Sequence, residues 1–524
     1  MADADVIVVG SGASAVNAAT PLIEAGRAVR MLDVGNEGGR YPMPEGPFDE
    51  VRRTDPDQHR YLLGDQFEGI GFGDTGVKAH LTPPRQWIAE GADRLQPVTS
   101  KSFFPLHSLA VGGLGGAWGA GAPCFVQADL TGFPIAFSDL APHYEAVASR
   151  IGINGARDDL WPFLGELQAL QPAVETDHNG ATLLSRYERS REKANRRSLY
   201  LGRPRLAMLT QPLRGRSANH LWDTDFWSDA GRSVYRPSWT VDELGASSRF
   251  ELITRKLVTS FVERDGWVEV TARDVDTNQV ETHRCRTLVL GAGTMGSTRV
   301  ALRSLGGGRT PLVCNPHTYM PFLNLNQLGK PVGKARHSLA QACMVYAPDG
   351  VDRPFTVGHL YSYRSLLMFR LIKDAPLPHR EGLEILRHLS PNFAVMILQH
   401  ADRPTPAKYC ELVGDKFTVE YASSASELAA NHEVESEVAR SLLRLRCVKL
   451  KAQHTGHATS THFAGTLPMT DRDEPLTTDR DGKLRGTRAV YVVDGSVFPT
   501  LPSKGLTFTM MANANRIATK IARA

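Results

Sequence analysis

The sequence has few cysteines and little excess charge. Its 524 residues include six cysteines, and no two of them form a CxxC pair or another spacing typical of a metal site. So few thiols in so long a chain favour scattered core residues in a reducing compartment over a disulfide framework. The formal net charge is only +4, which gives no reason to expect nucleic acid as a partner. We therefore expect a cytoplasmic protein that does not bind nucleic acid.

Segments that would place the chain in a membrane are also lacking. No basic region precedes the first apolar stretch, residues 6–9, so we expect no signal peptide. One uncharged run, residues 109–126, approaches the length of a bilayer span, but it contains six glycines and one proline. Because such a composition makes a poor helix, the run is predicted to be a packed loop, and no membrane contact is expected.

The first 33 residues carry a nucleotide-binding pattern. An apolar strand at residues 5–9 runs into Gly10-x-Gly12-x-x-Ala15, and a helical pattern and a second strand ending at Asp33 follow. Gly10 permits the tight turn, Gly12 lets the backbone approach a pyrophosphate, and Ala15 lets the helix pack closely on the strand. Asp33, about 20 residues beyond the turn, would hold a ribose hydroxyl. This order of elements predicts binding of a dinucleotide, either NAD or FAD.

Two further glycine-rich segments extend this pattern. Residues 111–121 hold so many glycines that the backbone is expected to pass close to a flat group, with Trp118 either stacked near the cofactor or filling core. Residues 287–290 form another apolar strand that meets Gly291-Ala-Gly293 and a helical pattern. Two such turns, far apart in sequence, imply one nucleotide-binding domain assembled from separate pieces.

The C-terminal segment, residues 454–515, predicts the chemical half of the site. A histidine-rich loop comes first, then a short apolar strand ending at Asp494-Gly495, then a loop that opens a helix at about Thr507. A histidine can act as a base near neutral pH, and a helix N-terminus favours negative charge. The order therefore predicts a base and a helix N-terminus beside one cofactor.

Three histidines lie on that loop, at positions 454, 457 and 462. No carboxylate or cysteine joins them at ligand spacing, so no metal site is predicted. Structural or hydrogen-bonding roles are expected for His454 and His457. Elsewhere, a strand is predicted to end at Val258, a hairpin to form from residues 267–274 and the segment after Asn278, and a long helix to run from about 426 to 448.

These blocks together resemble the glucose–methanol–choline (GMC) family of FAD oxidoreductases. The motif style is most similar to its sugar-oxidising branch, the pyranose oxidases and bacterial glycoside dehydrogenases. The segments that carry the resemblance are residues 8–15 with 32–35, 111–121, 289–299, and 462–469 with 491–514.

The resemblance implies that FAD is the cofactor. The residues expected to bind it are Gly10, Gly12, Ala13, Ala15, Asp33, Gly113, Gly116, Trp118, Gly119, Val258 through its backbone, Gly291, Asp494, Gly495, Leu506 and Thr507. In some sugar oxidases of the family, a histidine before the tryptophan links covalently to FAD. Here Ala117 stands at that position, so non-covalent FAD is expected.

The resemblance also assigns the catalytic positions. His462 matches the family's base, which takes the hydroxyl proton while a hydride leaves to flavin N5. A second catalytic residue, usually Asn or His, falls on Gly505, with Lys504 just before it. Either His462 works alone, or Lys504 or a residue of the second domain supplies the partner, or the reaction is not ordinary alcohol oxidation.

The expected fold class is α/β. It combines a Rossmann-like FAD-binding domain, of the GMC and p-hydroxybenzoate hydroxylase type, with an inserted α+β substrate domain built on an antiparallel sheet. The FAD-binding domain is expected to comprise residues 1–165, 226–310 and 451–524, and the substrate domain residues 166–225 and 311–450.

The expected activity is oxidation of a CH–OH group to a carbonyl. The expected substrate is a small molecule, such as a sugar, a glycoside or a similarly hydroxylated metabolite, with oxygen or another compound as electron acceptor. The alternative, motivated by Gly505, is a redox-neutral, lyase-like flavoenzyme on the same scaffold.

Overall fold

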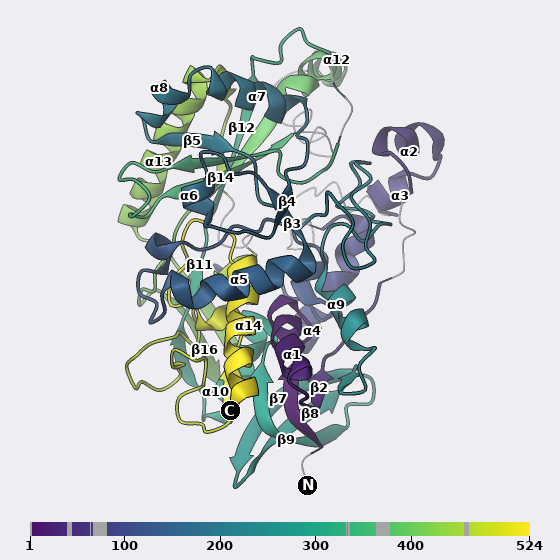
Figure 1. Ribbon diagram of the computed structural model, residues 1–524, viewed down its shortest axis with the longest axis vertical. Helices are drawn as coiled ribbons and strands as arrows, with labels where there is room; N and C mark the ends of the chain where they lie inside the picture. The colour runs from purple at the N-terminus through teal and green to yellow at the C-terminus, as the bar shows by residue number, and fades with distance from the viewer. Residues whose placement is uncertain are drawn as a thin grey trace.

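The computed structural model describes residues 3–38, 45–62, 64–65, 81–331, 333, 336–362, 378–454 and 461–524. These residues include two sheets of seven strands each. Figure 1 shows the two chain ends at the foot of the molecule, near α1 and α14, while α7, α8 and α13 lie at the opposite end. No helix among the described residues combines the length and apolar character needed to cross a bilayer.

The first sheet is mainly parallel. Its strands, in spatial order, are β6 (Phe250–Ile253), β2 (Val29–Leu32), β1 (Ala4–Val9), β9 (Val280–Leu290), β8 (Trp267–Asp274) and β7 (Lys256–Arg264), and β21 (Val490–Val492) also pairs with β9. In register, Val8 lies opposite Met31 on one side and Val289 on the other. The strands β7, β8 and β9 form an antiparallel extension. The predicted hairpin is therefore confirmed.

Two helices cover one face of this parallel sheet. Helices α1 (Ala13–Glu24) and α14 (Thr507–Arg523) bury small and branched apolar side chains against β1. Strands buried on both faces read as continuous apolar runs, which is how residues 6–9 appear in the sequence. Helix α5 (Phe137–Ile151) lies across α14, as Figure 1 shows, and His143 Nδ1 is 2.7 Å from Asn515 Oδ1.

The second sheet is antiparallel and spatially separate. Its order is β18 (Cys447–Lys449), β12 (His317–Asn324), β15 (Phe393–Gln399), β14 (Thr356–Ser362), β13 (Ala342–Tyr346) and β5 (Leu199–Gly202), and β19 (Gln453–His454) also pairs with β12. One face packs against α7 (His178–Glu188) and α13 (Ala425–Arg444). Because side chains alternate along a strand, the polar residues His317, His359 and Gln399 lie on the other face.

Shorter elements complete the described structure. The remaining strands are β3 (Ile153–Gly155), β4 (Leu170–Pro172), β10 (Gly308–Pro311), β11 (Val313–Cys314), β16 (Lys408–Val413), β17 (Lys416–Tyr421) and β20 (Phe463–Ala464). The remaining α-helices are α2 (Phe48–Thr54), α3 (His59–Leu62), α4 (Ala92–Leu95), α6 (Trp161–Leu164), α8 (Arg191–Asn195), α9 (Pro237–Leu244), α10 (Gly293–Ser304) and α12 (His379–Leu389).

The fold class is confirmed, with two differences in detail. Val258 is the third residue of β7 and not the end of a strand, because the left-handed conformation of Arg255 (φ 63°) separates β6 from β7. The long helix begins after Ser424, whose hydroxyl caps it together with Glu427, and ends at Arg444. Arg446 (φ 62°) then redirects the chain into β18. The domain boundaries remain a prediction.

Candidate active site

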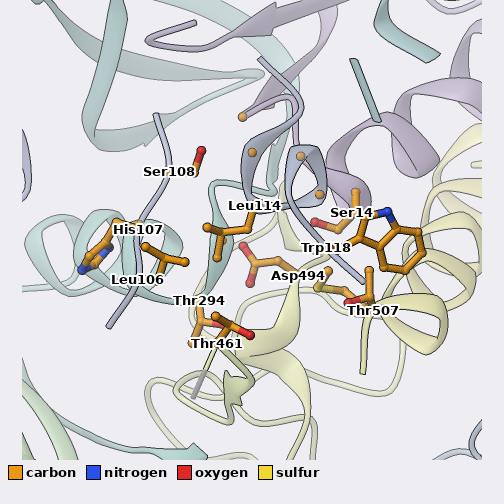
Figure 2. Close-up of a pocket in the computed structure, with 18 of the residues that line it drawn as sticks. Ser14, Leu106, His107, Ser108, Leu114, Trp118, Thr294, Thr461, Asp494 and Thr507 are labelled. Atoms are coloured by element: carbon orange, nitrogen blue, oxygen red, sulfur yellow. The ribbon is translucent and has the colours of Figure 1, made fainter. Parts of the chain in front are cut away.

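A cavity of about 380 Å³ lies between the two sheets. Gly10, Asp33 and Gly291, which line it, each directly follow the carboxyl end of a parallel strand, where open α/β sheets bind their ligands. His359 and Gln399 line it from the antiparallel sheet. Figure 2 shows part of the wall, with Ser14, Leu114, Trp118, Asp494 and Thr507 around one space.

The turn between β1 and α1 leaves room for a phosphate group. Gly10 has φ +90°, and a Cβ atom there would lie 2.6 Å from the carbonyl oxygen of Gly291, so no other residue fits without distortion. A Cβ atom on Gly12 would meet no heavy atom within 4 Å. Gly12 is also the N-cap of α1 and supplies no side-chain cap. The first N–H groups of α1 are thus available to an anion.

Asp33 lines the cavity at the end of β2. Burial raises the pKa of its carboxyl to about 6, although hydrogen bonds from Ser11 and from the backbone N–H of Gly35 act in the opposite direction. The Gly35 N–H lies 2.9 Å from Asp33 Oδ1. A carboxylate in this position can accept hydrogen bonds from ribose hydroxyls.

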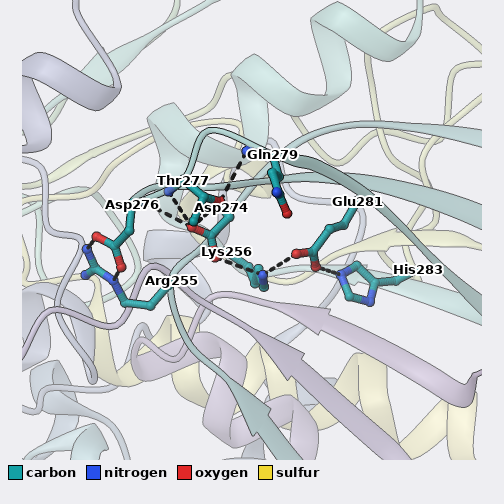
Figure 3. Close-up of polar contacts among 8 residues, drawn as sticks. All are labelled: Arg255, Lys256, Asp274, Asp276, Thr277, Gln279, Glu281 and His283. Atoms are coloured by element: carbon teal, nitrogen blue, oxygen red, sulfur yellow. Dashed lines mark hydrogen bonds and ion pairs between the residues drawn. The ribbon is translucent and has the colours of Figure 1, made fainter.

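Val258 lines the cavity from β7. Ion pairs hold the first residue of this strand, Lys256, in place. The backbone N–H of Lys256 donates to the carbonyl oxygen of Asp33 at 2.9 Å. Its ammonium group donates to Asp274 at 3.0 Å and to Glu281 at 2.5 Å, as Figure 3 shows. This network holds the start of β7 beside Asp33 and so places Val258 at the cavity.

Asp494 lines the cavity, and two small residues, Gly495 and Ala15, allow the chain to pack closely around it. Asp494 is fully buried and accepts hydrogen bonds from Ser297 Oγ at 2.5 Å and from the N–H of Ser496 at 3.0 Å. Burial raises the pKa of its carboxyl. Gly495 and Ala15 do not line the cavity: a Cβ atom on Gly495 would lie 2.9 Å from Thr294 Oγ1, and one on Gly291 would lie 3.0 Å from the Ala15 Cβ. Their small size allows close packing.

The glycine-rich segment forms a second wall. Gly113, Trp118 and Gly119 line the cavity, and the indole N–H of Trp118 donates to the carbonyl oxygen of Tyr235 at 2.7 Å. Gly116 faces Ile88 instead, since a Cβ atom there would lie 3.1 Å from the Ile88 Cδ1. The predicted packed loop contains the short 3-10 helix Gly113–Gly116.

His462 also lines the cavity. The N–H of Asn315 donates to the carbonyl oxygen of His462 at 3.0 Å, and the next residue, Phe463, begins β20. The ring of His462 meets that of His317 edge-on, with 5.4 Å between the ring centroids. Burial, together with a smaller contribution from the charge of His359, lowers the pKa of His462 to about 4. The imidazole is therefore neutral at pH 7 and can accept a proton.

Comparison with known proteins agrees with this geometry. Residues 416–514, which include His462, Asp494 and the start of α14, match a family model described as GMC oxidoreductase. The predicted resemblance to the GMC family is confirmed over these residues. A solved structure of pyridoxine 4-oxidase from Mesorbium loti is similar over the whole of both chains, with a TM-score of 0.59 and 13% sequence identity, which shows a shared fold. No curated protein matches the chain.

GMC oxidoreductases are flavoproteins that act on CH–OH donors, and this cavity fits a dinucleotide. Besides Gly12, Gly293 would place a Cβ atom in open space, so both turns leave backbone exposed to the cavity. Ala13, Leu506 and Thr507 line the same cavity. Ala117 also lines it and has no nucleophilic atom for a covalent link.

The position next to His462 departs from the GMC pattern. Gly505 lines the cavity, but Lys504 does not. The ammonium group of Lys504 is fully buried and donates to Asp129, to the carbonyl oxygen of Cys124 at 3.0 Å and to that of Phe163 at 2.5 Å. This ion pair holds the side chain away from the cavity, which speaks against a catalytic role for Lys504.

The antiparallel sheet supplies polar groups that the sequence motifs did not reveal. His359, Tyr361 and Gln399 line the cavity from β14 and β15. Burial lowers the pKa of His359 to about 4 and raises that of Tyr361. Gln399 is 8% exposed, and its Oε1 atom has no hydrogen-bond partner among the described residues. In the sequence, the only sign of these cavity-lining residues was a polar side chain within, or at the end of, an apolar strand.

The other two histidines of the C-terminal loop do not join this wall. His454 lies on β19 and contacts Glu435 on α13, with 2.9 Å between Nε2 and Oε2. His457 lies outside the described residues.

Proposed function

We propose that this protein is an FAD-dependent oxidoreductase that oxidises a CH–OH group to a carbonyl, with His462 as the base. The observation that carries the proposal is a neutral, cavity-facing imidazole in the same cavity as two dinucleotide-binding turns. FAD, when bound, supplies the acceptor for the hydride. The cofactor would be held non-covalently, with its pyrophosphate at Gly12 and the N-terminus of α1 and a ribose at Asp33.

His462 would remove the hydroxyl proton. An alcohol is a poor acid, so a base has to take its proton as the hydride leaves. The pKa of His462, about 4, keeps the imidazole unprotonated at neutral pH. The N-terminus of α14 adds a favourable field, since Leu506 and Thr507 line the cavity and the helix has no side-chain cap. Its free N–H groups and positive end would stabilise negative charge that develops nearby.

His359 is the best candidate for the missing second polar group. It lines the same cavity as His462 and the bare Gly505, and the two imidazoles are close enough for the charge of one to affect the other. As a neutral imidazole it offers one donor and one acceptor. We assign it to the reacting hydroxyl, as a positioning partner of His462.

The polar wall favours a substrate with several hydroxyl groups. Tyr361 and Gln399 each add hydrogen-bonding groups on the side of the antiparallel sheet. A buried amide oxygen without a partner costs free energy, and a substrate hydroxyl would relieve that cost. A sugar, a glycoside or a similarly hydroxylated metabolite meets this requirement.

The test is anaerobic reduction of the purified yellow protein by a panel of sugars, glycosides, secondary alcohols and pyridoxine. Pyridoxine is included because the similar structure is named pyridoxine 4-oxidase. The variant His462→Ala should keep its FAD and lose substrate-driven bleaching by about 10²–10⁴-fold in rate. His388→Gln, an exposed site on α12, serves as control. Equal bleaching in His462→Ala would remove His462 from the mechanism.

A redox-neutral reaction on the same scaffold is the second candidate. It is favoured by Gly505, which offers no side chain where the family usually has Asn or His. Turnover with no change in flavin absorbance would support this candidate. Bleaching by a substrate that is recovered as its carbonyl would exclude it.

A further inference from the structure

The back of the antiparallel sheet carries a second cluster of ionisable side chains. His432 and Glu435 lie on α13, and His454 lies on β19. One ligand atom from each of the three lies within 4.8 Å of the other two. Among the described residues this is the only such group of three or more histidine, cysteine, aspartate or glutamate side chains.

We propose that His432, Glu435 and His454 form a binding site for a divalent transition-metal ion of the Zn²⁺ type. Two imidazoles and one carboxylate are a ligand set that Zn²⁺ uses where a fourth position stays open to water. The spacing along the sequence predicted no metal site, because no carboxylate stands near His454. The fold supplies that carboxylate from α13.

The distances suit a metal ion after a small expansion. His432 Nδ1 lies 3.2 Å from Glu435 Oε2, and His454 Nε2 lies 2.9 Å from the same oxygen. Ligands about 2.0–2.2 Å from a tetrahedral ion are roughly 3.4 Å apart, so these two nitrogen–oxygen pairs need to open by only a few tenths of an ångström. The two nitrogens already lie within 4.8 Å of each other. The two imidazole rings are nearly perpendicular, with 4.9 Å between centroids, so both can direct a nitrogen at one point.

The carboxylate is buried and oriented, while the histidines are open to solvent. The side chain of Glu435 is 4% exposed, against 60% for His432 and 49% for His454. Thr318 Oγ1 donates to Glu435 Oε1 at 2.6 Å, and His400 Nε2 lies 3.5 Å from the same oxygen. Such outer partners fix the orientation of a ligand carboxylate. Solvent has access from the side of the histidines, which gives an ion a route in.

The proposed site lies behind the wall of the active site. Thr318 pairs in register with His454 on β19. The side chain of the preceding residue, His317, lies on the opposite face of the sheet and meets the ring of His462. Likewise His400 contacts Glu435, while the preceding Gln399 lines the cavity. An ion would therefore join α13 to the edge strand β19 and brace the sheet that carries His359 and Gln399. The ion would stabilise the fold from the face of the sheet opposite the cavity and would take no part in the redox chemistry.

The experiment is a metal titration of the FAD-loaded protein, without a histidine tag, after EDTA treatment and removal of the chelator. Zn²⁺ binding is measured by calorimetry, and Co²⁺ binding by its visible d–d absorbance. We expect one ion per chain, a higher melting temperature with Zn²⁺, and binding weakened at least about tenfold in His432→Ala and in His454→Ala. Both histidines are exposed, so these variants should fold.

A matched control variant separates this site from ordinary surface binding. His388→Gln removes one histidine from an exposed pair with Glu384 on α12, in which His388 Nε2 lies 3.5 Å from the carboxylate. It should bind Zn²⁺ like the unmodified protein. Equal affinities for the unmodified protein and the His432→Ala/His454→Ala double variant would overturn the proposal. Flavin content and substrate-driven bleaching report on the active site separately, so failure of one proposal does not imply failure of the other.

Discussion

The Cε1 atom of His462 lies 3.8 Å from the point that a Cβ atom on Gly505 would occupy. Residue 505 therefore borders the base directly, and its lack of a side chain keeps that side of the cavity open. In the proposed reaction, the partner for the hydroxyl would come from another element, and His359 on the antiparallel sheet lines the same cavity. The proposed reactive groups would thus come from the segment before β20 and from the antiparallel sheet.

Adding a methyl group at position 505 should affect the substrate more than the fold. Gly505 does not need a positive φ, and the contacts of a new Cβ atom, 3.8 and 3.9 Å, are ordinary van der Waals distances. We expect Gly505→Ala to change the free energy of unfolding by less than about 1 kcal/mol. Steady-state kinetics should show a higher KM with a smaller change in kcat. Loss of FAD or of the folded state would contradict this view of the cavity.

Breaking the buried ion pair should lower stability. Lys504→Met would leave the buried Asp129 carboxylate without its cation, which costs about 3–5 kcal/mol when one partner of a buried pair is removed. The double variant Lys504→Met/Asp129→Leu should recover part of that loss, as measured by urea unfolding. A Lys504→Met protein of normal stability that no longer bleaches with substrate would instead place Lys504 in catalysis.

The two glycines of the first turn should respond differently to alanine. Gly10→Ala forces a side chain into a φ of +90° and 2.6 Å from the carbonyl oxygen of Gly291, so we expect a destabilised protein without FAD. Gly12→Ala places its methyl group in open space, so the protein should fold. Its affinity for FAD should fall at least about tenfold, because the methyl group occupies space that the pyrophosphate needs. Circular dichroism and flavin content separate the two outcomes.

The acid limit of flavin reduction should lie below the usual histidine range. Burial disfavours the imidazolium form and lowers the pKa of His462 from 6.5 to about 4. Because the base works unprotonated, the rate should persist as pH falls below 6.5 and be lost as pH approaches 4. His359→Gln removes a neighbouring charge that lowers the pKa of His462, so the limit should move to higher pH. Stopped-flow flavin reduction measures this acid limit. A limit near pH 6.5 in the unmodified protein would contradict the assignment of His462 as the base.

The sequence by itself determined the elements whose requirements are local. The β1–α1 turn, the β9–α10 turn and the glycine-rich segment depend on backbone conformation and close approach, which single glycines and short apolar strands specify. The family, the fold class and the position of His462 followed from the order of these blocks.

Only the tertiary structure decided which side chains meet across the two sheets. The antiparallel sheet joins strands from residues 199–202 to 453–454, and which face of a strand lines the cavity depends on pairing that no short motif records. His359 and Gln399 line the cavity for that reason, and Lys504 does not line it because its ammonium group pairs with the buried Asp129. The same long-range packing brings His432 and Glu435 to His454, since contacts between distant segments follow from the burial of apolar faces and not from spacing along the chain.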